Sequence, residues 1–161
     1  MNKDFTIRRA TYRDTKAIHE VLLAAFEEYR DYYTPEAFTD TVLSEEAVKT
    51  RLHQMKVYVA IDQQEKIIGT IGWQNVSTKE GHIRGMAVHP ARQGKNSPAT
   101  DLLHQIEIDA RSEGCSIITL DATAVLQRAQ RFYQKQGYEQ TGKIGDYFGM
   151  VIYEFAKKIS K

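Results

Sequence analysis

The chain has 161 residues, and its 22 Lys and Arg nearly cancel its 21 Asp and Glu, which leaves a formal net charge of +1. This length suits one domain with a substantial core, and the charge balance argues against a general binder of nucleic acid or of membrane surfaces. The single cysteine, Cys115, excludes an internal disulfide and a zinc site built on paired cysteines.

The N-terminal residues lack the apolar core of a signal peptide, and no apolar run approaches the ~20 residues of a membrane span. A cytoplasmic protein is therefore expected. The first elements in chain order are a strand over residues 5–9 and a helix that Asp14 caps and that runs to about Arg30. Thr34-Pro35 and Ser44 each have the residue pattern of a further helix start.

Three strands, over residues 57–61, 66–74 and 82–88, follow one another with short polar turns between them, which predicts an antiparallel meander. A helix over residues 97–113 then leads to an apolar strand over 116–120. A right-handed crossover of this kind places the last strand parallel to the strand over 82–88.

A helix over 125–136 and a hairpin over 138–144 and 150–155 complete the chain. The pattern contains no linker and no repeat, so residues 1–161 are expected to form one domain. The predicted fold class is mixed α/β, with a mostly antiparallel sheet of six to seven strands, one parallel splayed pair and about four flanking helices.

The connection between the strand ending at Val88 and the following helix has the features of an anion pocket. Gly94 and Ser97 have little bulk, Arg92 and Lys95 add positive charge, and a helix N-terminus presents unpaired backbone N–H groups. Parallel strands that diverge here would also open a crevice at their carboxyl ends, where ligands commonly bind in α/β sheets.

Two motifs in this part of the chain resemble those of the GNAT superfamily of N-acetyltransferases. The run Val88-His89-Pro90-Ala91-Arg92-Gln93-Gly94-Lys95 is similar to the acetyl-CoA-binding motif of that superfamily, V-x-P-x-x-[R/Q]-G-x-G-x-[G/A]. The second signature, A-x-x-F-Y-x-K-x-G-F, is matched by Ala129, Phe132, Tyr133, Lys135 and Gly137-Tyr138. Where the first motif normally has further glycines, this chain has Asn96-Ser97-Pro98-Ala99, in which Ser97 is expected to cap the helix and Pro98 to be its first residue.

The resemblance implies a GNAT fold and an acetyltransferase that uses acetyl-CoA as co-substrate and needs no metal. It places the pantetheine arm along the main chain of Met86, Ala87 and Val88. It places the pyrophosphate on the loop amides, which belong to Gln93, Gly94, Lys95, Asn96, Ser97 and Ala99. It also assigns to Tyr133 the role of proton donor to the departing thiolate, which suits a phenol that is protonated at neutral pH.

The catalytic base is open between several groups. His82 stands six residues before Val88, where the histone-modifying branch of the superfamily carries a glutamate, and its ordinary pKa near 6.5 suits a base. It could equally be a solvated residue at a strand end. Glu27 and Glu28 are alternative bases, or groups that bind a cationic acceptor.

The regions that flank the acceptor cleft in the superfamily are rich in aromatic residues here, among them Tyr32 and Tyr147, which could line a pocket or cover the core. The first hypothesis is acetyl transfer from acetyl-CoA to a primary amine of a small molecule, by direct attack in a ternary complex. The alternatives are a protein or peptide N-acetyltransferase and a non-catalytic acyl-CoA-binding module. No nucleic-acid or membrane partner is expected, and a homodimer is left open.

Overall fold

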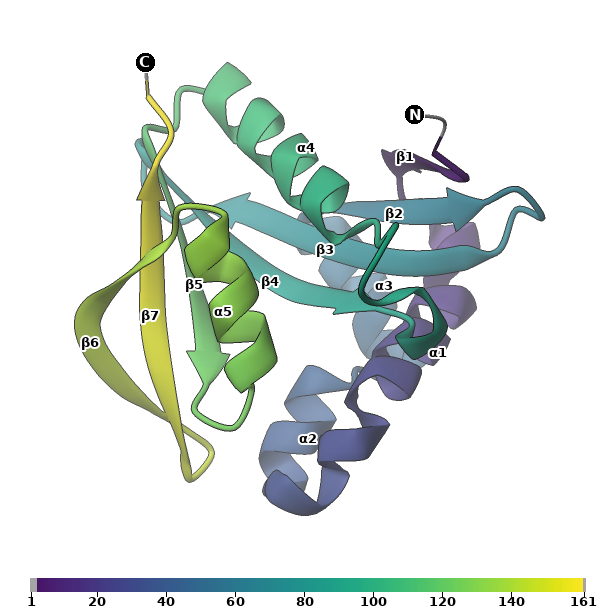
Figure 1. The fold of residues 1–161 in the computed structure, drawn as a ribbon, viewed down its shortest axis with the longest axis horizontal. Coiled ribbons are helices and arrows are strands. Elements are labelled where there is room, and N and C mark those ends of the chain that lie inside the picture. The colour runs from purple at the N-terminus through teal and green to yellow at the C-terminus, as the bar shows by residue number, and fades with distance from the viewer. Residues whose placement is uncertain (1–2, 161) are drawn as a thin grey trace.

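The structure, a computed structural model, describes residues 3–160. Within that range the chain forms one seven-stranded sheet in the order β1-β2-β3-β4-β5-β7-β6, together with five α-helices (Figure 1). All neighbouring strands are antiparallel except β4 and β5. The expected mixed α/β class, with a mostly antiparallel sheet and one parallel pair, is confirmed.

The N-terminal third contains β1 (Phe5–Arg9) and three helices, α1 (Thr15–Phe26), α2 (Pro35–Thr41) and α3 (Glu45–Gln54). The side chains of Thr34 and Ser44 accept hydrogen bonds from backbone N–H groups and cap α2 and α3, as expected. The first helix is shorter than predicted. It ends at Phe26, and residues 27–32 continue as a tighter 3₁₀ helix, which the helical spacing of apolar residues could not distinguish.

The meander consists of β2 (Lys56–Asp62), β3 (Ile67–Asn75) and β4 (Glu80–Val88). The register between β3 and β4 shifts between Thr70 and Gly72, so that β4 carries an extra residue at this point. Gly85 lies in this bulge with a φ of +73°, a conformation that favours glycine. The bulge bends β4 next to the point where it leaves its parallel neighbour.

The parallel pair is formed by β4 and β5 (Ile117–Thr123) over only part of its length. Pairing runs from Glu80 with Ile117 to Ile83 with Leu120, and beyond these residues the two strands diverge. The second half of β4 therefore has one edge open to a ligand, which is the splay that the crossover pattern predicted.

Helix α4 (Ala99–Ser112) begins one residue later than the capping pattern suggested. Pro98, which was expected to be the first helical residue, is the N-cap, and the side chain of Ser97 still accepts a hydrogen bond from the Ala99 N–H at 3.1 Å. Asn96, with a φ of +65°, and Gly94, with a φ of +86°, turn the chain tightly and delay the helix start.

Helix α5 (Gln127–Lys135), β6 (Glu139–Tyr147) and β7 (Met150–Lys158) complete the fold. The sheet has a buried core on each face. One core joins α4 and Tyr133 of α5 to the sheet, and the other packs α1 and α3 against β2. In Figure 1, α4 and α5 lie in front of the sheet and α1 and α3 lie behind it, so the splay between β4 and β5 opens between the two layers of helices.

Candidate active site

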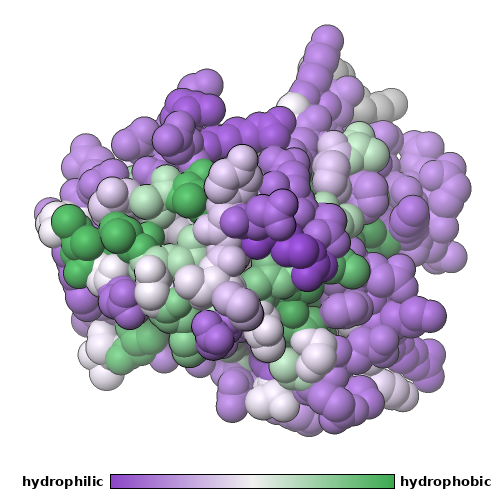
Figure 2. Space-filling view, turned by 90° about the horizontal axis from the view of Figure 1, so that it is seen from below, coloured by the Kyte–Doolittle hydropathy of each residue, from purple (hydrophilic) through white to green (hydrophobic). Residues whose placement is uncertain are grey.

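A cavity of about 960 Å³ occupies the splay between β4 and β5. This volume is in the range of small-molecule and cofactor sites. Its walls come from α1, α2, α3, β4, the loop before α4, β5, α5 and the β6–β7 hairpin. The face that Figure 2 presents has apolar and neutral side chains gathered between polar ones, as expected for a cavity with apolar walls and a polar rim.

The loop before α4 leaves several backbone donors available at one end of this cavity. In the described chain, the amides of Gly94, Lys95 and Asn96 donate to no protein acceptor, whereas the Ser97 N–H donates to the Gly94 carbonyl at 3.2 Å. The Gln93 N–H donates, at 3.4 Å, to the Pro90 carbonyl. Three successive free amides in a turn make an anion-binding concavity, and the adjacent start of α4 adds its dipole.

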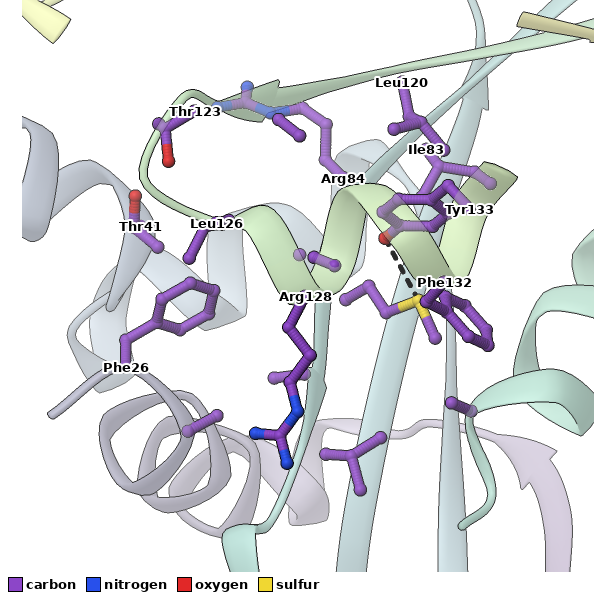
Figure 3. Close-up of a pocket in the computed structure, with 18 of the residues that line it drawn as sticks. Phe26, Thr41, Ile83, Arg84, Leu120, Thr123, Leu126, Arg128, Phe132 and Tyr133 are labelled. Atoms are coloured by element: carbon purple, nitrogen blue, oxygen red, sulfur yellow. Dashed lines mark hydrogen bonds between the residues drawn. The ribbon is translucent and has the colours of Figure 1, made fainter. Parts of the chain in front are cut away.

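Two side chains extend this loop toward β4 and α5. The Gln93 side-chain amide donates to the Val88 carbonyl at 3.0 Å, and Arg128 of α5 donates to the Gln93 side-chain oxygen at 2.9 Å. Arg128 (Figure 3) therefore adds a cation to the cavity wall beside the loop. This end of the cavity is equipped for a phosphate.

Tyr133 lies in the middle of the cavity wall, on α5. Its ring is buried, with 8% of the residue exposed, and its hydroxyl donates to the sulfur of Met86 on β4 at 3.2 Å (Figure 3). Burial raises the pKa of the Tyr133 phenol above its ordinary value, so the hydroxyl keeps its proton at neutral pH. A thioether is a weak acceptor, so a stronger one could replace it.

His82 lies half-buried on β4 and is held by a chain of hydrogen bonds. Its Nδ1 lies 2.7 Å from the Thr119 hydroxyl, and that hydroxyl donates its only proton to Glu80 at 2.7 Å. Thr119 can therefore only accept from His82, which places the ring proton on Nδ1 and leaves the lone pair on Nε2. His82 thus has a fixed tautomer with its basic nitrogen free.

The charges around His82 bear on its protonation. Nε2 lies 3.7 Å from a carboxylate oxygen of Asp121, which would stabilise a protonated ring. Burial nevertheless lowers the pKa of His82 below its ordinary value, and the positive charge of Arg84 acts in the same direction, against Asp121 and Glu80. The ring is therefore neutral, and able to accept a proton, at neutral pH.

The end of the cavity opposite the loop is built from polar side chains of separate elements. The Tyr147 hydroxyl donates to Asp40 at 2.7 Å and lies 2.9 Å from the Thr41 hydroxyl, and Arg84 donates to Asp40 at 3.0 Å. Arg51 of α3 also lines the cavity here. Burial and the neighbouring Arg84 lower the pKa of Arg51 to about 10, so the guanidinium remains charged at neutral pH.

The sequence of the chain matches the model of the Acetyltransferase (GNAT) family over residues 16–138. The chain belongs to the GNAT family of acetyltransferases. A search of curated proteins found no match. Many solved structures are similar, among them the PaiA N-acetyltransferase from Thermoplasma acidophilum in complex with coenzyme A, with 18% identity, a TM-score of 0.80, and 98% of this chain and 99% of that chain covered.

Two other solved structures of the same fold have different acceptors in their names. An aminoglycoside 6'-acetyltransferase type Ii is 20% identical, with a TM-score of 0.75 and 97% and 98% of this and that chain covered. The ribosomal-protein-S18-alanine N-acetyltransferase from Escherichia coli is 16% identical, with a TM-score of 0.77 and 98% and 95% covered. At these identities the likeness shows the GNAT fold, and each named acceptor belongs to the protein that carries the name.

The expected site residues of this GNAT acetyltransferase fall into two groups. His82, Met86, Ala87, Val88, Tyr133 and Tyr147 line the cavity, as do Gln93, Gly94, Asn96, Ser97 and Ala99 of the loop. Lys95 is exposed beside them. Glu27, Glu28 and Tyr32 are exposed on the 3₁₀ segment and are not among the lining residues; Glu27 pairs with Arg30 at its surface.

Sequence reasoning missed the arginines that line the cavity, which are Arg51, Arg84, Arg128 and Arg131. Arg84 carried a usable signal, because it lies two residues after His82 and alternate residues of a strand share a face. Arg51 and Arg128 stand on helices among other charged residues, and nothing in their local pattern marks them.

Among residues 3–160, no group of three or more His, Cys, Asp or Glu side chains is arranged to hold a metal ion. The described helices also include none that is both long and apolar enough to cross a membrane.

Proposed function

We propose that this GNAT acetyltransferase transfers an acetyl group from acetyl-CoA to a primary amine of a small molecule, by direct attack in a ternary complex. The observation that carries the proposal is that one continuous cavity joins free loop amides, a buried protonated phenol and an imidazole with a free basic nitrogen. These are the three kinds of group that acetyl transfer from a phosphorylated thioester to an amine needs.

The loop is the proposed site of the pyrophosphate. The amides of Gly94, Lys95 and Asn96 would donate to it, with Arg128 opposite, and the unpaired edge of β4 over residues 86–88 would run along the pantetheine arm. Asn96 adopts the positive φ that a family glycine would otherwise supply, which asparagine tolerates better than other residues with a side chain. The departure from the family motif therefore preserves the turn.

In the proposed reaction, the amine nitrogen attacks the thioester carbonyl carbon, a carbon–nitrogen bond forms and the carbon–sulfur bond breaks. Nε2 of His82 takes the proton that the amine loses, directly or through water, and Asp121 stabilises the imidazolium that results. Tyr133 donates its hydroxyl proton to the departing thiolate. That hydroxyl already points at a sulfur atom, because Met86 accepts its hydrogen bond.

A small acceptor is favoured over a peptide because α2 and the β6–β7 hairpin together cover the acceptor end of the cavity. Thr34, at the start of α2, donates to the Phe148 carbonyl in the β6–β7 turn at 2.8 Å, and Tyr147 of β6 is hydrogen-bonded to Asp40 and Thr41. These contacts tie α2 to the hairpin and so reduce the space through which a peptide chain could extend from the cavity. A purely acyl-CoA-binding role is disfavoured because it uses neither Tyr133 nor His82.

The test has two stages. Calorimetric titration with acetyl-CoA should show binding, and the protein should then release free thiol from acetyl-CoA in the presence of primary amines from a small-molecule panel. Binding without thiol release would support the binding-only alternative. Release with a peptide panel alone would support the protein-modifying alternative.

A further inference from the structure

We propose that the acceptor carries an anionic group, a carboxylate or a phosphate-like group, in addition to its amine, and that Arg51 holds that group. This inference rests on the proposed function, because it names the class of small amine that the cavity would accept. The structure assigns the anion to the end of the cavity where Arg51, Arg84, Asp40 and Tyr147 meet.

Arg51 is a cation that lines a cavity and has no counter-ion of its own. Within residues 3–160 its guanidinium forms no ion pair and donates no hydrogen bond to a protein acceptor. Arg84, which lies at the same end of the cavity, is paired with Asp40. Burial disfavours a charge without a partner, and the lowered pKa of Arg51 reflects that unfavourable environment.

The backbone of β4 is shaped around this guanidinium. A Cβ atom at Gly85 would collide with Nη1 of Arg51, so the glycine at the bulge leaves the space in which the guanidinium sits. The positive φ of Gly85 favours glycine, and a side chain here would force the Arg51 guanidinium out of its place. Arg51 is therefore positioned at the point where β4 leaves β5, beside the proposed path of the thioester.

The distribution of charge suits a molecule with an amine at one end and an anion at the other. Arg51, Arg84 and Asp40 together carry a net positive charge, because Asp40 neutralises only one of the two arginines. His82 and Arg84 share a face of β4, and Asp121 lies beside His82. Two residues along a strand span roughly 6–7 Å at ~3.3 Å per residue, which separates the backbone positions of His82 and Arg84. The guanidinium of Arg51 lies against Gly85, the next residue of β4.

The decisive experiment compares matched pairs of amines that differ in the anionic group. Glycine and β-alanine are paired with their primary amides, and 2-aminoethylphosphonate is paired with ethanolamine. Binding of each to the CoA complex of the protein is measured by thermal shift, and kcat/KM for acetylation is measured by thiol release. The wild type should bind and acetylate the anionic members preferentially, and the carboxylate and phosphonate pairs show which anion fits better.

The role of Arg51 is tested by the same selectivity ratio in variants. Arg51→Gln should reduce the ratio of anionic to neutral partner by ~10- to 100-fold, the loss expected for a charge-assisted hydrogen bond, and the ratio cancels differences in amine reactivity between the partners. Arg51→Lys should retain part of the preference. Arg13→Gln, which removes an exposed positive charge outside the cavity, is the control and should leave the ratio unchanged.

The outcomes separate this inference from the proposed function. Equal binding of anionic and neutral partners by the wild type, or an unchanged ratio in Arg51→Gln that still binds acetyl-CoA, would overturn the inference even if amines are acetylated. Preferential binding of the anionic partners that is lost in Arg51→Gln would support it even if no acetyl transfer occurs, and in that case the proposed function alone would fail.

Discussion

The two ends of the cavity are built in different ways. The end next to α4 is made mainly of backbone, with three free amides in one short loop and the open edge of β4. The opposite end is made of side chains. Those of α2, β4 and β6 are joined by hydrogen bonds between these elements, and Arg51 of α3 lies beside them. The first end suits a ligand common to a whole family, and the second can change without altering the fold.

This difference explains how mutations should act. Backbone donors are ordered by the turn itself, so substitutions in the loop matter only when they disturb the turn. Side-chain groups act individually, so each substitution around His82, Tyr133 or Arg51 should remove a defined function. The following predictions test that contrast.

The largest effect is expected for Tyr133→Phe, which removes only the hydroxyl. The buried ring still fills its place in the core, so the fold should be retained, while kcat should fall by ~10²-fold because the thiolate loses its proton donor. Steady-state thiol release at saturating acetyl-CoA measures this, and circular dichroism checks the fold. Unchanged turnover would remove Tyr133 from the mechanism.

A loss of similar size, ~10²-fold in kcat/KM at neutral pH, is expected for His82→Gln. The ratio of wild-type to variant kcat/KM, followed against pH, isolates His82 because the titration of the amine substrate is common to both. A base must be neutral to act, and burial lowers the pKa of His82, so the ratio should be constant at neutral pH and fall only below the ordinary histidine value of ~6.5. A ratio that does not vary with pH would show that His82 is not the base.

A smaller effect is expected from Thr119→Val, which leaves His82 in place but removes the hydroxyl that fixes its tautomer. Loss of one such hydrogen bond corresponds to a fall in kcat of roughly tenfold. The same ratio can be measured in the Thr119→Val background, by dividing kcat/KM of Thr119→Val by that of the Thr119→Val/His82→Gln double variant. The pH at which this ratio falls should differ from the pH at which it falls for the wild type. Thr119→Ser, which keeps the hydroxyl, should restore both properties; if it does not, lost packing rather than the hydrogen bond is responsible.

The smallest effects on acetyl-CoA binding are expected for substitutions in the loop. Their size should depend on how well the new residue tolerates the backbone conformation at its position. Asn96→Val places a β-branched residue at a φ of +65°, which costs ~1–2 kcal/mol and should weaken acetyl-CoA binding by ~5- to 30-fold. Asn96→Gly should bind at least as tightly as the wild type. Lys95→Ala, which removes an exposed charge, should change the dissociation constant by no more than ~5-fold in calorimetric titrations. A larger effect from Lys95 than from Asn96→Val would contradict a backbone-built site.

The fold and the loop end of the cavity could both be predicted from the sequence, because both depend on local backbone conformation. Strand alternation, capping residues and the loop from Gln93 to Ala99 are local, and local patterns determine backbone conformation. The exact start of α4 was wrong by one residue because Asn96 and Gly94 both take positive φ, which a sequence pattern does not distinguish from a helix start.

The other end could not be predicted in the same way. Arg51, Asp40 and Tyr147 are far apart in the sequence and meet only because α2, α3 and the β6–β7 hairpin close on the bulge of β4. The acidic residues Glu27 and Glu28 were plausible acceptor ligands by position, yet the change to a 3₁₀ helix after Phe26 leaves them on the surface. Tertiary packing, rather than local sequence, decides which charges face the cavity.

The most direct test of the account is a crystal structure of the protein with coenzyme A. The pyrophosphate should lie within hydrogen-bond distance of the Gly94, Lys95 and Asn96 amides, and the thiol sulfur should accept the Tyr133 hydrogen bond that Met86 accepts in the free protein. Coenzyme A bound elsewhere, or bound with its sulfur out of reach of Tyr133, would contradict the proposed site and its chemistry.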